Sequence, residues 1–416
     1  MILPQLAQGA GTRSIEAQLA EAAGLAEAIG IEVVERRAVK VRSPRASTLM
    51  GKGQVEALAA DVAAQGAELV VVDAPITAVQ QKNLEEQFRA KVIDRTGLIL
   101  EIFGERAATA EGRMQVELAH LDYQAGRLVR SWTHLERQRG GFGFLGGPGE
   151  TQIEADRRLI RDRMAKIRRE LEQTARTRTL HRARRKKAPW PVIALVGYTN
   201  AGKSTLFNRL TGADVMAADL LFATLDPTMR DMALPGFDKA ILSDTVGFVS
   251  NLPTQLVAAF RATLEEVTAA DLIVHVRDIA HPDSDAQAAD VLDVLKSIGA
   301  SGEESPPLIE AWNKIDVPDA EAADAFRTEA ARRRDDVAIL SAETGEGVDD
   351  LLRLLTARLQ VGGSVRRLSV PSGAGAKLAW LHNHGQVIES EVGETETLVT
   401  VRLGDADYAR FQSQVG

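Results

Sequence analysis

A glycine-rich octapeptide in the middle of the chain combines the residue types that bind polyphosphates. It comprises Gly197, Tyr198, Thr199, Asn200, Ala201, Gly202, Lys203 and Ser204, and Thr205 follows it. Glycines let backbone N–H groups approach phosphate oxygens, the lysine can reach the β- and γ-phosphates, and the serine hydroxyl can bind Mg²⁺. An apolar run at 192–196 precedes the octapeptide and an apolar-periodic stretch follows it, as the strand–loop–helix context of this motif requires. The octapeptide predicts a site for a nucleoside triphosphate.

A second motif has groups suited to a metal ion and to the terminal phosphate. It comprises Asp244, Thr245, Val246 and Gly247, and it begins 41 residues after Lys203 at the end of an apolar run. The Asp244 carboxylate can hold Mg²⁺ directly or through water, and the Gly247 N–H can approach the γ-phosphate. We therefore predict that Lys203 and Gly247 are catalytic residues.

Two later motifs have groups that distinguish guanine from adenine. The first comprises Asn313, Lys314, Ile315 and Asp316, and the second comprises Ser341, Ala342 and Glu343. The Asp316 carboxylate can accept hydrogen bonds from N1–H and the 2-amino group of guanine. Adenine has an acceptor at N1 and no 2-amino group, so it would leave the carboxylate unpaired. A backbone N–H of the second motif can meet guanine O6. The four motifs, each at the end of an apolar run, predict a guanine nucleotide site.

The segment between the first two motifs is placed to respond to the γ-phosphate. It includes Phe222, Ala223, Thr224, Leu225 and Asp226. A GTPase needs a mobile loop here with a threonine that binds Mg²⁺ only when the γ-phosphate is present. Thr224, which lies 21 residues after Lys203, is our candidate, and Thr228 is the alternative. We therefore predict Ser204 and Thr224 as metal ligands and add Thr224 to the catalytic residues.

The elements that must position these motifs are strands that alternate with helices. Within residues 189–360, apolar runs recur at 192–196, 240–242, 272–276, 308–312 and 337–340, with helical patterns between them. This alternation predicts a doubly wound α/β sheet, the fold of a P-loop GTPase domain. Residues 1–105 alternate in the same way and predict a small N-terminal α/β domain with a parallel sheet. Residues 361–416 predict a small C-terminal α+β domain.

Residues 106–188 predict a long antiparallel hairpin of two helices. Apolar residues recur at four-three spacing, as Met114, Leu118, Leu121, Ala125 and Leu128 in the first helix and Ile153, Ile160, Met164, Ile167 and Leu171 in the second. The glycine-rich tip between the helices carries Trp132, Phe142, Phe144 and interspersed arginines. Such side chains can stack on unpaired bases and pair with phosphates, which favours an RNA-contacting tip. The alternative is a flexible loop whose aromatic rings pack back onto the helices.

The charges of the chain are unevenly distributed. Residues 151–187 hold fourteen Lys/Arg and five Asp/Glu, a balance of +9, although the whole chain has a net charge of −8. A basic element in an acidic protein indicates local contact with a polyanion, and the alternative is a solvated helix face followed by a basic linker.

Composition excludes several other classes of protein. The chain has no cysteine, which excludes disulfides, cysteine nucleophiles and zinc–thiolate sites and fits a reducing compartment. No apolar run approaches the roughly 18–20 residues of a membrane span, and no secretory signal is apparent. We expect a cytoplasmic monomer without a membrane anchor, and a peripheral membrane association of part of the protein stays open.

The motifs together resemble those of the HflX family of translational GTPases. The resemblance includes the phosphate loop, the segment 222–228, the run 244–248 and the helix 256–267, and upstream the segments 92–100, 132–135 and 147–152. It implies a protein that binds GTP, GDP and Mg²⁺ and associates with the large (50S) ribosomal subunit and its rRNA. Ribosome splitting or rescue, translation and ribosome biogenesis are the roles it implies. It also implies a hairpin tip that probes the peptidyl-transferase region. The family tip usually reads Gly-Ile-Gly-Thr-Arg, and the segment 141–146 lacks the expected basic residue.

Two positions bear on the rate of hydrolysis. Phe248 stands where many small GTPases place a glutamine that orients the attacking water, and a phenyl ring cannot do so. We therefore predict slow intrinsic hydrolysis and stimulation by the ribosomal subunit. Asn200 resembles the asparagine of GTPases activated by K⁺, and the alternative is that it only orders the loop.

Two other classes of function stay open at this point. One is a nucleotide-dependent RNA-remodelling ATPase or GTPase with a second nucleotide site in residues 1–105, where no phosphate loop occurs. The other is a signalling switch without an RNA partner. Lipidation signals are lacking, and the basic second helix favours RNA.

Overall fold

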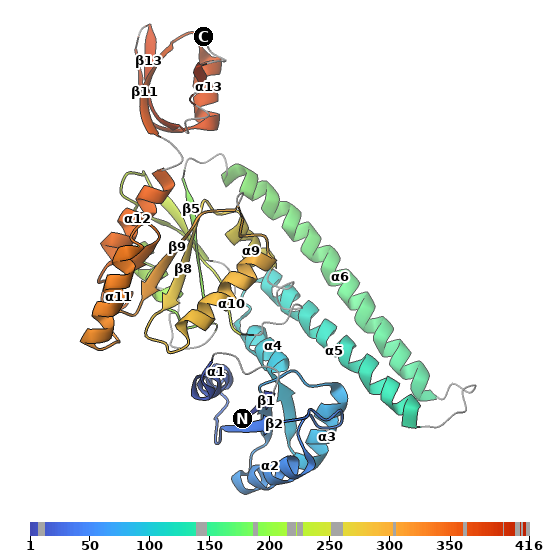
Figure 1. Ribbon diagram of the computed structural model, residues 1–416. Coiled ribbons are helices and arrows are strands. Elements are labelled where there is room, and N and C mark those ends of the chain that lie inside the picture. The colour runs from blue at the N-terminus through green and yellow to red at the C-terminus, as the bar shows by residue number, and fades with distance from the viewer. Residues whose placement is uncertain are drawn as a thin grey trace.

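The computed structural model describes most of the chain. The described residues are 1–6, 13–138, 148–185, 190–213, 222, 228–250, 261–302, 305–360, 364–393, 395–403, 408 and 411–412. Figure 1 shows two α/β regions, a projecting pair of helices and a small C-terminal unit.

A four-stranded parallel sheet forms the N-terminal region. Its strand order is β2-β1-β3-β4, with β1 at Ile2–Leu6, β2 at Arg37–Val41, β3 at Leu69–Val72 and β4 at Lys91–Asp94. The helices are α1 at Ile15–Glu27, α2 at Lys52–Gln65, α3 at Ala78–Phe88 and α4 at Arg95–Arg106. The parallel sheet predicted from the alternating pattern is confirmed. Helix α4 lies on the side of this sheet that faces the second α/β region (Figure 1).

Two long helices follow and pack side by side. They are α5 at Ala110–Gln138 and α6 at Pro148–Arg185, and they project along one side of the molecule (Figure 1). The apolar seam is only partly as the spacing predicts. Met164 and Ile167 of α6 are buried. In the part of α5 whose side chains the structure describes, the buried hydrophobic residues are Val116 and Ala119, which belong to the core that includes residues of α4. Helix α5 packs against three helices, α6, α4 and α3. The prediction that Trp132 belongs to the tip is wrong, because the helical pattern of α5 continues to Gln138 and includes this residue. The glycine-rich segment at 139–147, with Phe142 and Phe144, lies outside the described residues.

A six-stranded sheet carries the predicted nucleotide motifs. Its strand order is β10-β9-β8-β5-β7-β6, with β5 at Val192–Gly197, β6 at Thr228–Met232, β7 at Ala240–Asp244, β8 at Leu272–Asp278, β9 at Leu308–Asn313 and β10 at Val337–Ile339. All neighbours are parallel except β6 and β7. The helices are α7 at Lys203–Thr211, α9 at Arg261–Thr268, α10 at Ser284–Ser297, α11 at Ala320–Arg332 and α12 at Val348–Gln360. This is the predicted doubly wound P-loop GTPase fold.

Burial explains why the strands of this sheet could be recognised from composition. Residues 193–196 of β5 are all 0% exposed, because helices cover both faces of the central strands. Strand β6 lacked this signal, since its pattern leaves Arg230 and Asp231 exposed at the sheet edge.

A small antiparallel unit follows the six-stranded sheet in the chain. It contains β11 at Ser364–Pro371, α13 at Gly375–His384, β12 at Gln386–Val392 and β13 at Glu396–Leu403, in the strand order β11-β13-β12. Leu381 of α13 packs on Val370, Val399 and Val401. This is the predicted α+β unit. Among the described residues, no helix combines the length and apolar character needed to cross a bilayer.

Candidate nucleotide-binding site

The phosphate loop connects β5 with α7 and has a backbone that requires glycine. Gly202 caps the N-terminus of α7 at φ +88°, and a Cβ there would lie 2.2 Å from Nδ2 of Asn313. A Cβ at Gly197 would lie 2.2 Å from the carbonyl oxygen of Val276 on β8. The two glycines thus let the loop lie against β8 and β9. The loop presents the N-terminus of α7, where backbone N–H groups bind anions.

Lys203 is buried against the phosphate loop. Its Nζ donates a hydrogen bond to the carbonyl oxygen of Tyr198 at 2.8 Å. Burial lowers the pKa of Lys203 to about 8, although the nearby Asp244 carboxylate opposes this shift. The acceptor of this hydrogen bond is a neutral carbonyl group. A polyphosphate would therefore stabilise the charged form of the buried ammonium group.

Ser204, in the first turn of α7, lies beside Asp244, the last residue of β7. The Ser204 hydroxyl donates to Oδ2 of Asp244 at 2.8 Å, and Asp244 is 0% exposed. A hydroxyl and a carboxylate are oxygen ligands of the kind that Mg²⁺ prefers. The donor set therefore fits a magnesium ion beside the phosphates.

Gly247 lies against the phosphate loop. A Cβ at this position would be 2.7 Å from Cγ2 of Thr199 and 3.1 Å from Nζ of Lys203. Backbone hydrogen bonds fix the contact, because Thr199 N donates to the carbonyl oxygen of Phe248 at 2.7 Å and Phe248 N donates to that of Gly197 at 3.1 Å. Thr245 is tied to β5 by its hydroxyl, which donates to the carbonyl oxygen of Leu195 at 2.6 Å. Val246 is buried in the adjoining core.

Asn313 joins the phosphate loop to the predicted base-binding motifs. Its Nδ2 donates to the carbonyl oxygen of Ala201 at 2.8 Å, and its Oδ1 accepts from the N–H of Ala342 at 2.8 Å. The side chain is buried at 2% exposure. One amide thus fixes three segments of the site relative to one another.

The remaining residues of the base motifs surround this amide. Lys314 has a φ of +67° and forms an ion pair with Asp278 at 2.8 Å. Ile315 is buried, whereas Asp316 is exposed and open to a ligand. The Ser341 hydroxyl accepts from the N–H of Thr344 at 3.0 Å, which shapes the loop that contains Glu343.

Arg209 is a supporting residue that the sequence motifs do not include. It lies in the last turn of α7, and its Nε donates to the carbonyl oxygen of Ala342 at 2.5 Å. Its Nη2 donates to the carbonyl oxygen of Glu343. A Cβ at Gly345 would lie 2.7 Å from Nη1 of Arg209, so glycine leaves room for the guanidinium. No local pattern marks this contact, because it links residues 133 positions apart.

The predicted γ-phosphate segment is described only in part. Phe222 is buried at 2% exposure with a φ of +59°. Ala223, Thr224, Leu225 and Asp226 lie outside the described residues. The alternative threonine, Thr228, begins β6 and pairs with Asp244 across the sheet. Asn200 is exposed, with a φ of +60°, and Thr205 follows in the first turn of α7.

The fold and these four motifs define a P-loop GTPase. Comparison with known proteins gives the family. Three family models match in succession, namely a GTP-binding GTPase N-terminal region at 16–104, a GTP-binding GTPase middle region at 106–185 and a 50S ribosome-binding GTPase at 192–314. GTPase HflX of Magnetococcus marinus is 48% identical over 399 residues, which cover 95% of this chain and 90% of the relative. GTPase HflX of Escherichia coli is 43% identical over 398 residues, which cover 95% and 92%. The chain belongs to the HflX family of GTPases.

A more distant similarity exists among solved structures. A GTP-binding protein of Sulfolobus solfataricus in complex with GDP aligns with 86% of this chain and 99% of its own, at 23% identity and a TM-score of 0.44. A similarity this distant supports no statement about the site.

Proposed function

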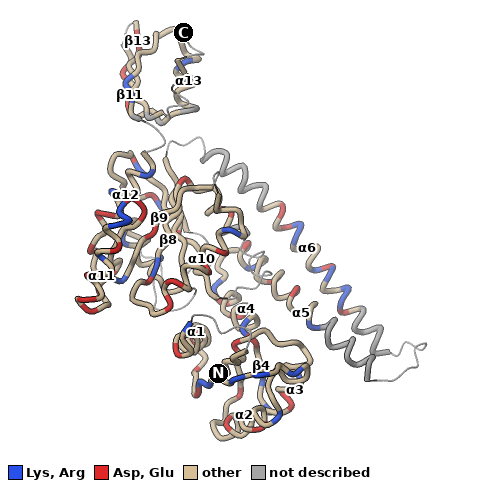
Figure 2. The backbone as a smooth tube through the Cα atoms, viewed as in Figure 1, with Lys and Arg blue, Asp and Glu red and all other residues tan. Residues whose placement is uncertain are grey.

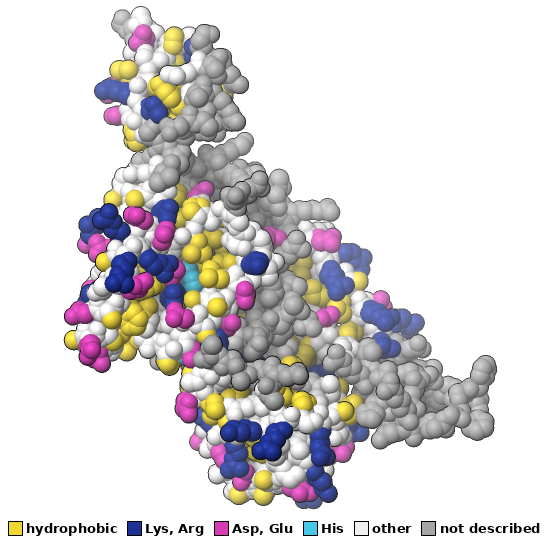
Figure 3. All heavy atoms as spheres, viewed as in Figure 1, with side chains coloured by type: hydrophobic (Ala, Val, Ile, Leu, Met, Phe, Trp, Pro, Cys, Tyr) yellow, Lys and Arg dark blue, Asp and Glu magenta, His cyan; other side chains and the backbone are white. Residues whose placement is uncertain are grey.

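We propose that this GTPase acts on the large ribosomal subunit, in ribosome splitting, rescue, translation or biogenesis, and that it contacts rRNA through the helical hairpin. The observation that carries the proposal is the basic surface of α6. Its exposed cationic side chains are Arg158, Arg161, Arg163, Lys166, Arg168 and Arg169. Figure 2 shows lysines and arginines along the described part of the helix, and Figure 3 shows Lys and Arg side chains exposed on that part of the surface. Rows of lysine and arginine bind nucleic acid mainly through phosphates. The match to a 50S ribosome-binding GTPase supports the same partner.

The position of Phe248 supports the need for a partner in hydrolysis. Its side chain is 1% exposed and belongs to the core that includes Val246 and Val249. A buried phenyl ring can neither orient water nor stabilise charge, so the free protein lacks that contribution to phosphoryl transfer. We propose that the ribosomal subunit supplies the missing group.

Turnover with and without ribosomal subunits tests this proposal. We expect GTP hydrolysis to rise at least tenfold when purified large subunits are added, and the protein to co-sediment with them in a non-hydrolysable GTP analogue. The double variant Arg161→Glu/Arg168→Glu should weaken co-sedimentation at least tenfold, because it places repulsive charges on α6. Arg332→Glu/Arg353→Glu, on exposed arginines of α11 and α12, is the matched control. Full turnover without subunits would contradict the stimulation, and an absence of binding would favour a signalling switch without an RNA partner.

We propose that Ser204, Asp244 and Thr224 hold Mg²⁺, either directly or through water. A bound Mg²⁺ would neutralise charge on the β- and γ-phosphates. We expect Ser204→Ala to lower turnover about 100-fold at 1 mM Mg²⁺ and to raise the Mg²⁺ concentration needed for half-maximal rate, because one oxygen ligand is lost. Titration of turnover with Mg²⁺ measures this. Ser297→Ala, on α10, is the control, and an unchanged Mg²⁺ requirement would exclude Ser204 as a ligand.

Activation by K⁺ through Asn200 is a separate hypothesis. The φ of +60° provides a structural reason for asparagine, since this residue tolerates the left-handed region better than most. Turnover in KCl and in NaCl at equal ionic strength decides between the two explanations. Equal turnover of the wild type in the two salts would mean that Asn200 only orders the loop. The variant Asn200→Gly lacks the amide oxygen, so we expect it to turn over equally fast in KCl and NaCl under either explanation.

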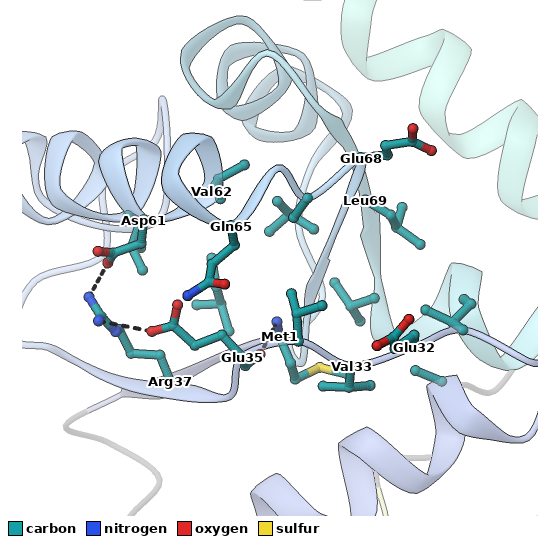
Figure 4. Close-up of a pocket in the computed structure, with 18 of the residues that line it drawn as sticks. Met1, Glu32, Val33, Glu35, Arg37, Asp61, Val62, Gln65, Glu68 and Leu69 are labelled. Carbon is teal, nitrogen blue, oxygen red and sulfur yellow. Dashed lines mark hydrogen bonds and ion pairs between the residues drawn. The ribbon is translucent and has the colours of Figure 1, made fainter.

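The structure disfavours the alternative of a second nucleotide site in the N-terminal region. A cavity of about 410 Å³ opens there, near the N-terminal ends of β1 and β3 (Figure 4). Its charged lining residues are Glu32, Glu35, Asp61, Glu68 and Arg37. Arg37 already pairs with Asp61 and Glu35. A predominantly acidic lining repels phosphates, so we assign no nucleotide to this cavity.

We further propose that the protein is a cytoplasmic monomer whose domains comprise residues 1–105, 106–188, 189–360 and 361–416. The pattern of apolar residues along the sequence changes near these boundaries, which supports the division into domains. Analytical ultracentrifugation measures the oligomeric state.

A further inference from the structure

Arg95 connects the N-terminal region with the segment that follows Gly247. It is the first residue of α4 and is 6% exposed. Its Nη2 lies 2.9 Å from Oγ and 3.2 Å from the carbonyl oxygen of Ser250, and its Nε lies 3.3 Å from the same carbonyl. Ser250 comes three residues after Gly247. The guanidinium thus holds the backbone that leads from the predicted γ-phosphate contact.

The same guanidinium belongs to a buried cluster that also anchors the phosphate loop. Arg95 pairs with Asp73 at 2.6 Å and with Glu21. The Tyr198 hydroxyl donates to Oε2 of Glu21 at 2.7 Å and accepts from the N–H of Ser250 at 2.6 Å. Burial first, and the Glu21 charge second, raise the pKa of Tyr198, so the phenol stays protonated and can donate. The cluster therefore ties the loop and the segment after Gly247 to one set of N-terminal charges.

The hairpin controls the residue next to Arg95. Asp94 is 2% exposed, and its Oδ1 caps α4 by accepting from the N–H of Gly97 at 2.8 Å. Two side chains of α5 hold this carboxylate. The Tyr123 hydroxyl donates to Oδ1 at 2.7 Å, and Nη2 of Arg127 donates to Oδ2 at 2.8 Å. A displacement of α5 would therefore move the N-terminus of α4 and Arg95 with it.

The other end of α4 contacts the predicted γ-phosphate segment. The ring of Phe103 packs edge-to-face on that of Phe222, with centroids 4.6 Å apart. Both rings are nearly fully buried in the core that also contains Phe248. One helix thus touches the chain on both sides of the site, near Phe222 and near Gly247 (Figure 1 shows its place).

We propose that Arg95 is a positioning residue for GTP hydrolysis. By holding Ser250 it adds to the backbone hydrogen bonds of Phe248 that keep Gly247 at the phosphate loop, and α5 sets the position of Arg95 through Asp94. The inference rests on the GTPase activity and not on ribosome binding. In this proposal, the buried contacts of α4 couple the position of the hairpin to the geometry of the nucleotide site.

Steady-state turnover without ribosomes tests the proposal. We expect Arg95→Ala to lower kcat at least tenfold with KM and the Kd for GDP within twofold, because the phosphate loop and the base motifs supply most of the binding contacts and GDP lacks the γ-phosphate that Gly247 approaches. Arg95→Lys should recover part of kcat, since it restores one charged donor. Tyr123→Phe, more distant from the nucleotide, should lower kcat twofold to fivefold with KM unchanged. Arg106 lies at the other end of α4 and donates to the carbonyl oxygen of Ala28, so Arg106→Ala should leave kcat within twofold.

A loss of folded protein is distinguished from a loss of positioning by the stoichiometry of GDP binding. If Arg95→Ala does not fold, Ser250→Ala replaces it. This variant removes the hydroxyl contacts to Arg95 and Glu21 but keeps the contacts of Arg95 to the backbone carbonyl, so it should lower kcat twofold to fivefold at constant KM. A variant that binds one GDP and keeps wild-type kcat would overturn the proposal. Equal falls in kcat for Arg106→Ala would also overturn it. Co-sedimentation with large subunits, measured in parallel, reports separately on the proposed function.

Discussion

Asp316→Asn should change the preferred base from guanine to xanthine. In the wild type the carboxylate accepts from N1–H and the 2-amino group of guanine. An amide presents one acceptor and one donor, so it still accepts from N1–H and now donates to the C2 carbonyl of xanthine. The amino group of guanine faces the amide NH₂ and loses its acceptor, which costs several kcal/mol because two donors then face each other. We expect the affinity for GDP to fall roughly 100- to 1,000-fold and that for xanthosine diphosphate to rise by a similar factor.

The structure supports this expectation by the placement of Asp316. The residues before it are fixed, since Asn313 and Ile315 are buried and Lys314 pairs with Asp278, whereas Asp316 itself is exposed. Competition binding with both diphosphates measures the change. Asp324→Asn, on an exposed carboxylate of α11, is the control and should leave both affinities unchanged. An Asp316→Asn protein that still prefers GDP would show that another residue selects the base.

Asn313→Ala should weaken the binding of every nucleotide. The substitution removes two hydrogen bonds and leaves the carbonyl oxygen of Ala201 and the N–H of Ala342 without their partner in a buried place. Each unsatisfied group costs roughly 1–3 kcal/mol, so the phosphate loop and the base loop separate more easily. We expect the Kd for GDP to rise about 100-fold, with similar losses for GTP and for xanthosine nucleotides. This uniform loss differs from the selective effect of Asp316→Asn.

Isothermal titration with GDP measures this effect, and thermal unfolding of the nucleotide-free protein reports the cost to the fold. Asn83→Ala is the matched control. Asn83 also donates from its side chain to a backbone carbonyl, that of Ser47 at 2.9 Å, but it is exposed and remote in the chain from the site. A Kd for GDP within threefold of the wild type would mean that Asn313 does not couple the two loops.

The strands and helices could be predicted where burial is uniform or periodic. β5, β8 and β9 are buried on both faces and appear as continuous apolar runs, and the alternation of strands with helices predicts their parallel order. The apolar pattern did not predict every element at the edge of a sheet or at the junction between two regions of the fold. β6, at the edge of its sheet, has no continuous apolar run, and α4, at the junction of the two α/β regions, buries apolar residues on several sides, so no single periodic face marks it.

The apolar seam of the hairpin shows that the periodicity of a helix also predicts its buried residues incompletely. Met164 and Ile167 of α6 are buried as their spacing predicts, since this face of α6 packs on α5. On α5 the spacing identifies one seam, but Val116 and Ala119 are the more buried residues because α4 covers a second face. Periodicity in a single helix cannot reveal how many neighbours it has.

The sequence by itself determined the ligand class, the order of the motifs and the family. These follow from groups that lie within a few residues of one another, such as the glycines and lysine of the phosphate loop, so chemistry and spacing suffice to recognise them. Only the tertiary structure decided how the groups are joined. The bond from Asn313 to Ala201 spans 112 residues, and the bond from Arg95 to Ser250 spans 155. Such contacts leave no local pattern, because folding, and not spacing along the chain, brings their partners together.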